Sequence, residues 1–179
     1  MALTATLRRF AIALADADRG VYEDLDLRVA QHPSEAERYL VTRVLARCLE
    51  HAQGVDFTRG LAAADEPAIW QRDLRGELQS WIEVGSPTAE RLHKASKTGA
   101  RIAVYAWTRT RELARDIAAH PVHRRDELEL HALDYRVLDR IVETLDRKNR
   151  WELAVSGGTL YLSIGKAAFE TTPERVFIP

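Results

Sequence analysis

The middle of the chain alternates strand-like and helix-like segments, and this alternation limits the possible folds more than any other feature of the sequence. An apolar segment over 77–85 precedes a predicted helix that starts at Ser86-Pro87 and ends at Gly99. Further segments follow in the order strand 101–107, helix 109–119, strand 128–133 and helix 135–145. Strands separated by helices are typical of a sheet with helices on its faces. We therefore predict an α/β (α+β) fold with a mixed central sheet flanked by helices.

Predicted hairpins lie at both ends of the chain. Apolar residues in 2–15 recur with a period near two, residues 16–20 form a turn, and 21–30 is the return strand. Strands over 151–155 and 160–164 flank Gly157-Gly158, a pair that favours a tight turn. We expect these terminal hairpins to form a second, antiparallel sheet. Residues 169–179 are expected to be strand or extended coil.

Composition limits the class of protein. Apolar residues make up 46% and charged residues 30% of the chain, which is typical of a soluble globular protein. Cys48 is the single cysteine, which favours a reducing compartment, and no long uncharged apolar run is present. We therefore expect a cytoplasmic protein with no membrane partner. Because the sequence contains no repeat or linker, we predict one domain over 1–179.

The first helix is predicted to begin at Ser34. Ser34 with Glu37 three residues later is a capping box, and Glu35 lies in the first turn, where a carboxylate suits the helix dipole. The helix should end near Ala52. Its predicted buried stripe consists of Leu40, Val41, Val44, Leu45, Cys48 and Leu49.

Glu83 is a carboxylate inside an apolar strand. Side chains alternate along a strand, so Glu83 shares a face with Trp81, and the simplest interpretation is a wetter face of a half-exposed strand. If 66–73 and 77–85 form a hairpin that turns at Leu74-Arg75, Glu66 lies opposite Glu83, with Asp65 beside it. Like charges at this spacing need a cation between them, and Mg²⁺ is a hard cation held by carboxylates.

Several motifs together resemble one bacterial family. They are His32-Pro-Ser-Glu35, Phe57-Thr-Arg-Gly-Leu61, Asp65-Glu-Pro67 with Trp70, Asp73 and Gly76, and Trp81-Ile-Glu-Val-Gly-Ser-Pro87. Met1-Ala-Leu-Thr-Ala-Thr6 and Thr172-Pro-Glu174 match as well. On these residues the chain resembles the YaeQ family over nearly its whole length, most weakly between about 108 and 126.

The resemblance implies a fold related to the PD-(D/E)XK nuclease superfamily, in which acidic residues bind Mg²⁺ for phosphodiester hydrolysis. Glu83 matches the acidic residue of the second motif strand, and Glu35 matches the carboxylate of the preceding helix. Two positions depart from the pattern: Ala68 follows Pro67 where an Asp is usual, so that Asp65 or Glu66 would have to substitute, and Gly85 stands at the lysine position. Lys94 or Lys97 would then replace that lysine.

Each of these residues also has an ordinary structural interpretation. Glu35 suits the helix dipole, Lys94 and Lys97 suit a solvated helix face, and Trp70 and Trp81 suit sheet packing. Zinc-ligand spacing, a nucleophile elbow and a phosphate-binding loop are lacking in the sequence.

Two functions therefore stay open. One is a Mg²⁺-dependent nuclease with metal ligands Glu35, Asp65, Glu66 and Glu83, catalytic residues Glu83 and Lys94, and nucleic acid as its partner. The alternative is a non-catalytic binding or regulatory module with a degenerate nuclease-like site. The formal net charge of −1 disfavours a general polyanion binder, although arginines between 101 and 125 could form a local basic surface. The sequence does not predict an oligomeric state.

Overall fold

The computed structural model describes residues 4–179, which form two compact units. Of the described residues, 4–41 and Asp134–Pro173 make up unit 1, and Thr42–Leu133 and Glu174–Pro179 make up unit 2. The division falls inside helix α1 (Glu37–Leu49). A single domain over 1–179 therefore stays a prediction.

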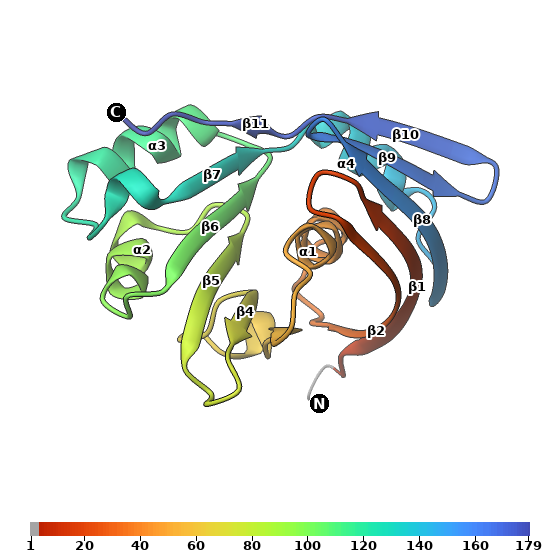
Figure 1. The fold of residues 1–179 in the computed structure, drawn as a ribbon, viewed down its shortest axis with the longest axis horizontal. Helices are drawn as coiled ribbons and strands as arrows, with labels where there is room; N and C mark the ends of the chain where they lie inside the picture. The colour runs from red at the N-terminus through yellow and green to blue at the C-terminus, as the bar shows by residue number, and fades with distance from the viewer. Residues whose placement is uncertain (1–3) are drawn as a thin grey trace. The chain divides into compact units, whose positions relative to one another are not determined.

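Unit 1 is built on a five-stranded sheet in the order β10-β9-β8-β1-β2 (Figure 1). Its elements are β1 (Thr6–Asp16), β2 (Val21–Gln31), α4 (Tyr135–Val142), β8 (Lys148–Ser156), β9 (Thr159–Ile164) and β10 (Ala167–Thr171). The two predicted hairpins meet in this sheet, but β1 runs parallel to β8, so the sheet is mixed rather than wholly antiparallel. Phe10 and Trp151 pack edge to face in its core with ring centroids 5.1 Å apart.

Unit 2 contains the predicted central sheet, with six strands in the order β11-β7-β6-β5-β4-β3. The elements are β3 (Val55–Phe57), η1 (Gly60–Ala62), β4 (Ile69–Arg72), β5 (Leu78–Val84), α2 (Ala89–Ser96), β6 (Arg101–Ala106), α3 (Thr110–Ala119), η2 (Arg125–Glu127), β7 (Glu129–Ala132) and β11 (Glu174–Arg175). Strands β5, β6 and β7 are parallel, and α2 and α3 lie on one face of them (Figure 1). A buried apolar cluster that includes Leu92, Val104, Ile117 and Leu130 joins these helices to the sheet.

The predicted capping box at Ser34 is wrong. Helix α1 begins at Glu37, and Glu35 lies in the turn that precedes it. The Ser34 hydroxyl lies 2.7 Å from His32 Nδ1, and a Glu35 carboxylate oxygen accepts a hydrogen bond from the His32 backbone N–H. These contacts close a turn over 32–35, because local side-chain bonds compete with helix formation.

The boundaries of the other predicted elements shift for similar local reasons. Helix α2 begins three residues after Ser86, because Thr88 is its N-cap and its Oγ1 accepts from Arg91 N–H at 3.2 Å. Strands β3 and β10 were not predicted as separate strands, and α4 ends three residues before Leu145.

Helix α1 is buried on all sides rather than along one stripe. Residues 40–48 are all buried, Thr42, Arg43 and Arg47 among them, whereas Leu49, which was predicted as part of the stripe, is only partly buried. None of the helices within residues 4–179 is long and apolar enough to span a membrane.

Candidate functional site

Glu83 lies near the carboxyl end of β5 and is 4% exposed. Its carboxylate oxygen Oε1 accepts a hydrogen bond at 2.7 Å from Nε1 of Trp81, which shares its strand face, and a second from Arg91 Nε at 2.7 Å. The wetter, half-exposed position that the alternation favoured is therefore wrong. Glu83 is a buried charge that the protein satisfies with its own donors.

Arg91 connects Glu83 to a turn of the chain. It projects from the first turns of α2, and the rest of its guanidinium donates hydrogen bonds to the carbonyl oxygens of Ala64 and Glu66. The cation that pairs with Glu83 is thus Arg91. One guanidinium holds the strand, the helix and the 63–66 turn together.

Burial raises the pKa of the Glu83 carboxyl, and the charge of Arg91 and the Trp81 hydrogen bond oppose this rise. The dominant cause is removal of the carboxylate from water rather than repulsion by a neighbouring carboxylate.

The β4–β5 register separates Glu66 from Glu83. Ile69 pairs with Ile82 and Trp70 with Trp81, and the register shifts between Gln71 and Arg72. Continued by one residue, this register brings Ala68 rather than Glu66 to Glu83, so the predicted Glu66–Glu83 pairing is wrong. The bulge accounts for one residue of this two-residue difference, because one strand contributes an extra residue, and the turn, which is centred on Arg75, accounts for the other.

The other predicted ligands are engaged or placed elsewhere. Glu66 lies in the turn before β4 and accepts three bonds from Arg59, whose hydrogen bonds hold the pKa of Glu66 below its usual range. Asp65 is exposed in the same turn, and Glu35 belongs to unit 1. Lys94 pairs with Glu90 on the exposed side of α2.

These residues do not fit a magnesium site. At the position implied by the family pattern, Ala68 supplies no oxygen ligand, and Arg91 supplies the positive charge beside Glu83. Within residues 4–179, no three His, Cys, Asp or Glu side chains are grouped so that they could hold a metal ion. Mg²⁺ binding remains a prediction from the resemblance.

A second charged cluster in unit 2 was not predicted. Arg101 at the start of β6 donates to Glu50 at 2.8 Å and to Glu129 at 2.9 Å, and Tyr105 donates to Glu50 at 2.7 Å. His131 stacks on Tyr105 with centroids 4.8 Å apart and lies 3.2 Å from Glu129. The alternation of β6 and β7 placed these side chains on one face, but only the fold brings Glu50 to them.

The charges of this cluster are strongly coupled to its hydrogen bonds. The hydrogen bonds from His131 and Arg101 hold the pKa of Glu129 well below its usual range. Burial and the neighbouring Glu50 raise the pKa of Tyr105 well above its usual range. The cluster therefore keeps Glu129 ionised and Tyr105 protonated at neutral pH.

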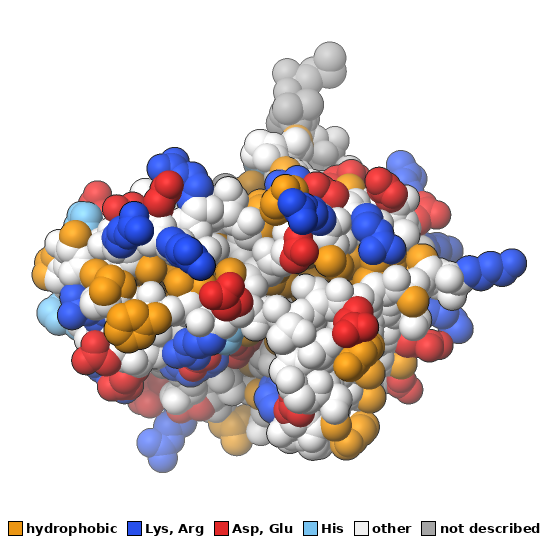
Figure 2. Space-filling view, turned by 90° about the horizontal axis from the view of Figure 1, so that it is seen from above, with side chains coloured by type: hydrophobic (Ala, Val, Ile, Leu, Met, Phe, Trp, Pro, Cys, Tyr) orange, Lys and Arg blue, Asp and Glu red, His pale blue; other side chains and the backbone are white. Residues whose placement is uncertain are grey.

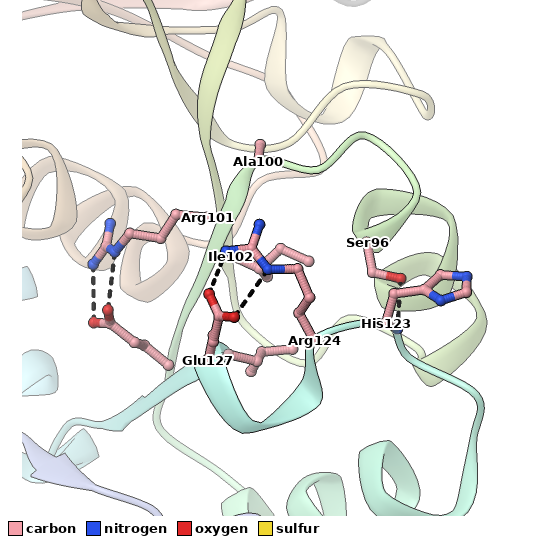
Figure 3. A pocket seen from close by; sticks show the side chains of 9 residues that line it. Ser96, Ala100, Arg101, Ile102, His123, Arg124 and Glu127 are labelled. Carbon is pink, nitrogen blue, oxygen red and sulfur yellow. Dashed lines mark hydrogen bonds and ion pairs between the residues drawn. The ribbon is translucent and has the colours of Figure 1, made fainter.

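A pocket of about 270 Å³ opens beside this cluster. It is lined by Ser96, Ala100, Arg101, Ile102, His123, Arg124, Glu127, Leu128 and Glu129. In the view of Figure 3, the Arg124–Glu127 pair lies between Arg101 with its carboxylate partner and the Ser96–His123 contact. Each lining arginine is paired with a carboxylate, so the polar wall has donors and acceptors in balance.

The arginine-rich segment does not form a surface of one sign. Arg109 pairs with Glu112 and Arg124 with Glu127, and Asp116 and Asp126 lie among the arginines. Figure 2 shows blue and red side chains interspersed on the face that it displays. Arg101, Arg109 and Arg124 are thus held in ion pairs with carboxylates, so the segment does not present an unbroken basic surface.

The chain is similar to proteins of one family over nearly its whole length. The family model described as "YaeQ protein" matches residues 1–173. "Uncharacterized protein YaeQ" from Escherichia coli K12 is 30% identical over 171 residues, which cover 95% of this chain and 94% of that protein. The Salmonella typhi protein of the same name is 31% identical over 164 residues, 91% of each chain.

Solved structures support the same similarity. The crystal structure of YaeQ protein from Pseudomonas syringae has a TM-score of 0.89 and 30% identity, with 97% of this chain and 96% of that chain covered. The YaeQ structure from Xanthomonas axonopodis pv. citri has a TM-score of 0.88 and 31% identity, with 98% and 100% covered.

Proposed function

The chain belongs to the YaeQ family, and we propose that it acts as a non-catalytic binding module in which the nuclease-like carboxylate stabilises the fold. One observation carries the proposal: Glu83 is buried and bound by Arg91 and Trp81. In this role the carboxylate fixes α2 against β5 and does not face a substrate.

Magnesium-dependent hydrolysis would require this arrangement to break. Arg91 would have to leave Glu83 before a metal ion could approach, and its bonds to the carbonyls of Ala64 and Glu66 would be lost with it. A Mg²⁺ ion held by two carboxylates would also need a second one beside Glu83, and Ala68 does not supply it. The cost of breaking a partly buried, hydrogen-bonded pair favours the binding role.

The binding site in this proposal is the pocket beside Arg101. Its wall pairs Arg101 with Glu129 and Arg124 with Glu127, and its floor includes the apolar side chains of Ile102 and Leu128. Balanced charge favours a small polar ligand without net charge, either neutral or zwitterionic, since a simple anion would meet two carboxylates. A volume of about 270 Å³ suits a ligand of metabolite size.

The metal question is tested by titration calorimetry with MgCl₂ and MnCl₂ and by cleavage assays on single- and double-stranded DNA and RNA. We expect no binding heat and no cleavage. Saturable Mg²⁺ binding that disappears in Glu83→Gln, together with Mg²⁺-dependent cleavage, would overturn the proposal.

The pocket is tested by thermal-shift measurements with free amino acids, neutral nucleosides and inorganic phosphate. We expect stabilisation by a zwitterionic or neutral compound, its loss in Arg124→Ala, and its retention in the control Arg115→Ala, an exposed residue of α3 outside the pocket. Stabilisation by phosphate alone, or equal losses in both variants, would exclude this site.

A further inference from the structure

Strand β2 is the last strand at one edge of the unit 1 sheet, and it is long. The other sheet edges in the described part of the chain are short: β10 has five residues, β3 has three and β11 has two, whereas β2 has eleven. An unpaired edge exposes backbone N–H and C=O groups that can pair with another strand. The length of β2 therefore makes it the edge best able to bind a further strand.

β2 lacks most of the devices that block edge pairing. Its pairing with β1 runs from Thr6–Gln31 to Asp16–Val21 without a bulge, and Val21–Gln31 contains no proline or lysine. One face carries Asp24, Asp26 and Arg28, all exposed, and the other face carries the exposed Glu23 followed by Leu25, Leu27 and Val29. The charges at the centre of the strand, Asp24, Asp26 and Arg28, therefore decide which strand is accepted.

We propose that β2 pairs antiparallel with β2 of a second copy of the chain, about a two-fold axis at Leu27. Residues equally distant from Leu27 then face each other. Asp26 of each copy lies opposite Arg28 of the other, which makes two cross-strand ion pairs. On the other face, Leu25 lies opposite Val29 of the second copy, and the two Leu27 side chains meet. The five strands of each unit 1 sheet continue into one sheet across the interface.

The charge pattern selects this register over its neighbours. An axis at Asp24, Asp26 or Arg28 places that charged residue against itself. An axis at Leu25 places Asp24 opposite Asp26 twice. Like charges directly opposite each other are destabilising, so of the axes from residue 24 to residue 28 only the one at Leu27 avoids a like-charge pair.

Asp26 can accept the additional partner. It already accepts two hydrogen bonds from Arg9, both at 2.7 Å, on its own sheet. A carboxylate offers about four lone-pair sites, so Arg28 of the second copy can bind without displacing Arg9. One strand pair buries a small area, and we therefore expect reversible, micromolar association.

The test is sedimentation equilibrium of the full chain with paired charge reversals. Wild type should form dimers, and Asp26→Arg and Arg28→Asp should each dimerise about tenfold or more weakly, since either change creates two like-charge pairs. Mixing the two variants should restore dimerisation. In the mixture, the Asp26→Arg chain carries two positive side chains at positions 26 and 28, and the Arg28→Asp chain carries two negative ones. Both cross-strand pairs between positions 26 and 28 are then opposite in charge.

The control is Asp24→Asn, which removes a carboxylate of the same face that lies opposite Ala30 of the second copy. It should dimerise as wild type does. Circular dichroism spectra identical to wild type would show that each variant is folded. A wild-type monomer at high micromolar concentration, or a mixture that stays as weak as its components, would overturn the proposal.

Discussion

Arg91 Nε lies 2.7 Å from Glu83 Oε1, so a side chain of α2 supplies the positive charge that a buried carboxylate of β5 needs. The same guanidinium reaches the carbonyl oxygens of Ala64 and Glu66 in the turn before β4. A contact between two residues eight positions apart therefore also fixes a turn 25 residues away in sequence.

The Glu83–Arg91 pair should be strongly coupled in a double-mutant cycle. Arg91→Met should destabilise the protein at pH 7 by about 3–5 kcal/mol, because it leaves a buried carboxylate without its cation. Glu83→Gln should cost less, about 1–3 kcal/mol, because Arg91 is partly exposed and keeps its carbonyl partners. Urea unfolding of both single variants and the double variant measures the coupling.

Lys94→Met is the matched control for this cycle, since Lys94 is 73% exposed and pairs with Glu90 on the surface. It should change the free energy of unfolding by no more than about 1 kcal/mol. Additive losses in the Glu83 and Arg91 variants would mean that the ion pair does not stabilise the fold.

Removing Arg91 should raise the pKa of Glu83 further. Burial already raises this pKa, and the Arg91 charge opposes the rise. Because protonated Glu83 needs no cation, the destabilisation by Arg91→Met should be smallest at low pH. It should grow as the pH rises through the folded-state pKa values of wild type and variant. Carbon-detected NMR titration of Glu83 checks the shift, and an unchanged pKa would contradict it.

Glu129 should make the protein sensitive to acid. Hydrogen bonds from His131 and Arg101 hold its pKa below the ordinary value near 4.3, so its contribution to stability is complete above that pH and falls as the pH drops toward the folded-state pKa. Wild type should therefore lose stability more steeply than Glu129→Gln between about pH 5 and pH 3. Urea unfolding across this range measures both slopes, and parallel curves would refute the prediction.

Gly54 and Gly76 should respond differently to alanine. Both have a positive φ, 81° and 83°, which disfavours any side chain. A Cβ at Gly54 would lie 1.8 Å from the Arg72 carbonyl oxygen, whereas one at Gly76 would meet nothing within 4 Å. Gly76→Ala should cost about 1–2 kcal/mol, and Gly54→Ala clearly more. Thermal unfolding compares them, and equal losses would show that the Arg72 backbone moves away at no cost.

Periodicity predicted most elements of the fold because it is a local property. The apolar spacings that predicted β5, β6, β7 and α3 reflect which side chains face a core, and the cluster around Leu92, Val104 and Leu130 contains those residues. Where side chains made unexpected local bonds, the prediction failed. The contacts of His32 with Ser34 and Glu35 delayed the start of α1.

The register of β4 against β5 could not be predicted from local sequence patterns. The predicted Glu66–Glu83 pairing assumed a regular hairpin centred on Leu74-Arg75. The observed hairpin is centred on Arg75, since Arg72 pairs with Leu78, and the bulge between Gln71 and Arg72 shifts the register by one more residue, so that Ala68 rather than Glu66 comes toward Glu83. A bulge costs little and has no clear sequence signature, so hairpin numbering cannot locate a facing residue to within one position.

The sequence by itself determined that Glu83 lies in a strand and shares a face with Trp81, because side-chain alternation is a local property. The burial of its carboxylate, and with it the need for a partner, came from the fold. Only the tertiary structure decided which partner it has. Arg91 and Lys94 lie about one turn apart on α2, and no local pattern separates them. The packing of α2 against β5 places Arg91 on Glu83 and leaves Lys94 in solvent, because a helix can bring only part of its surface to the sheet.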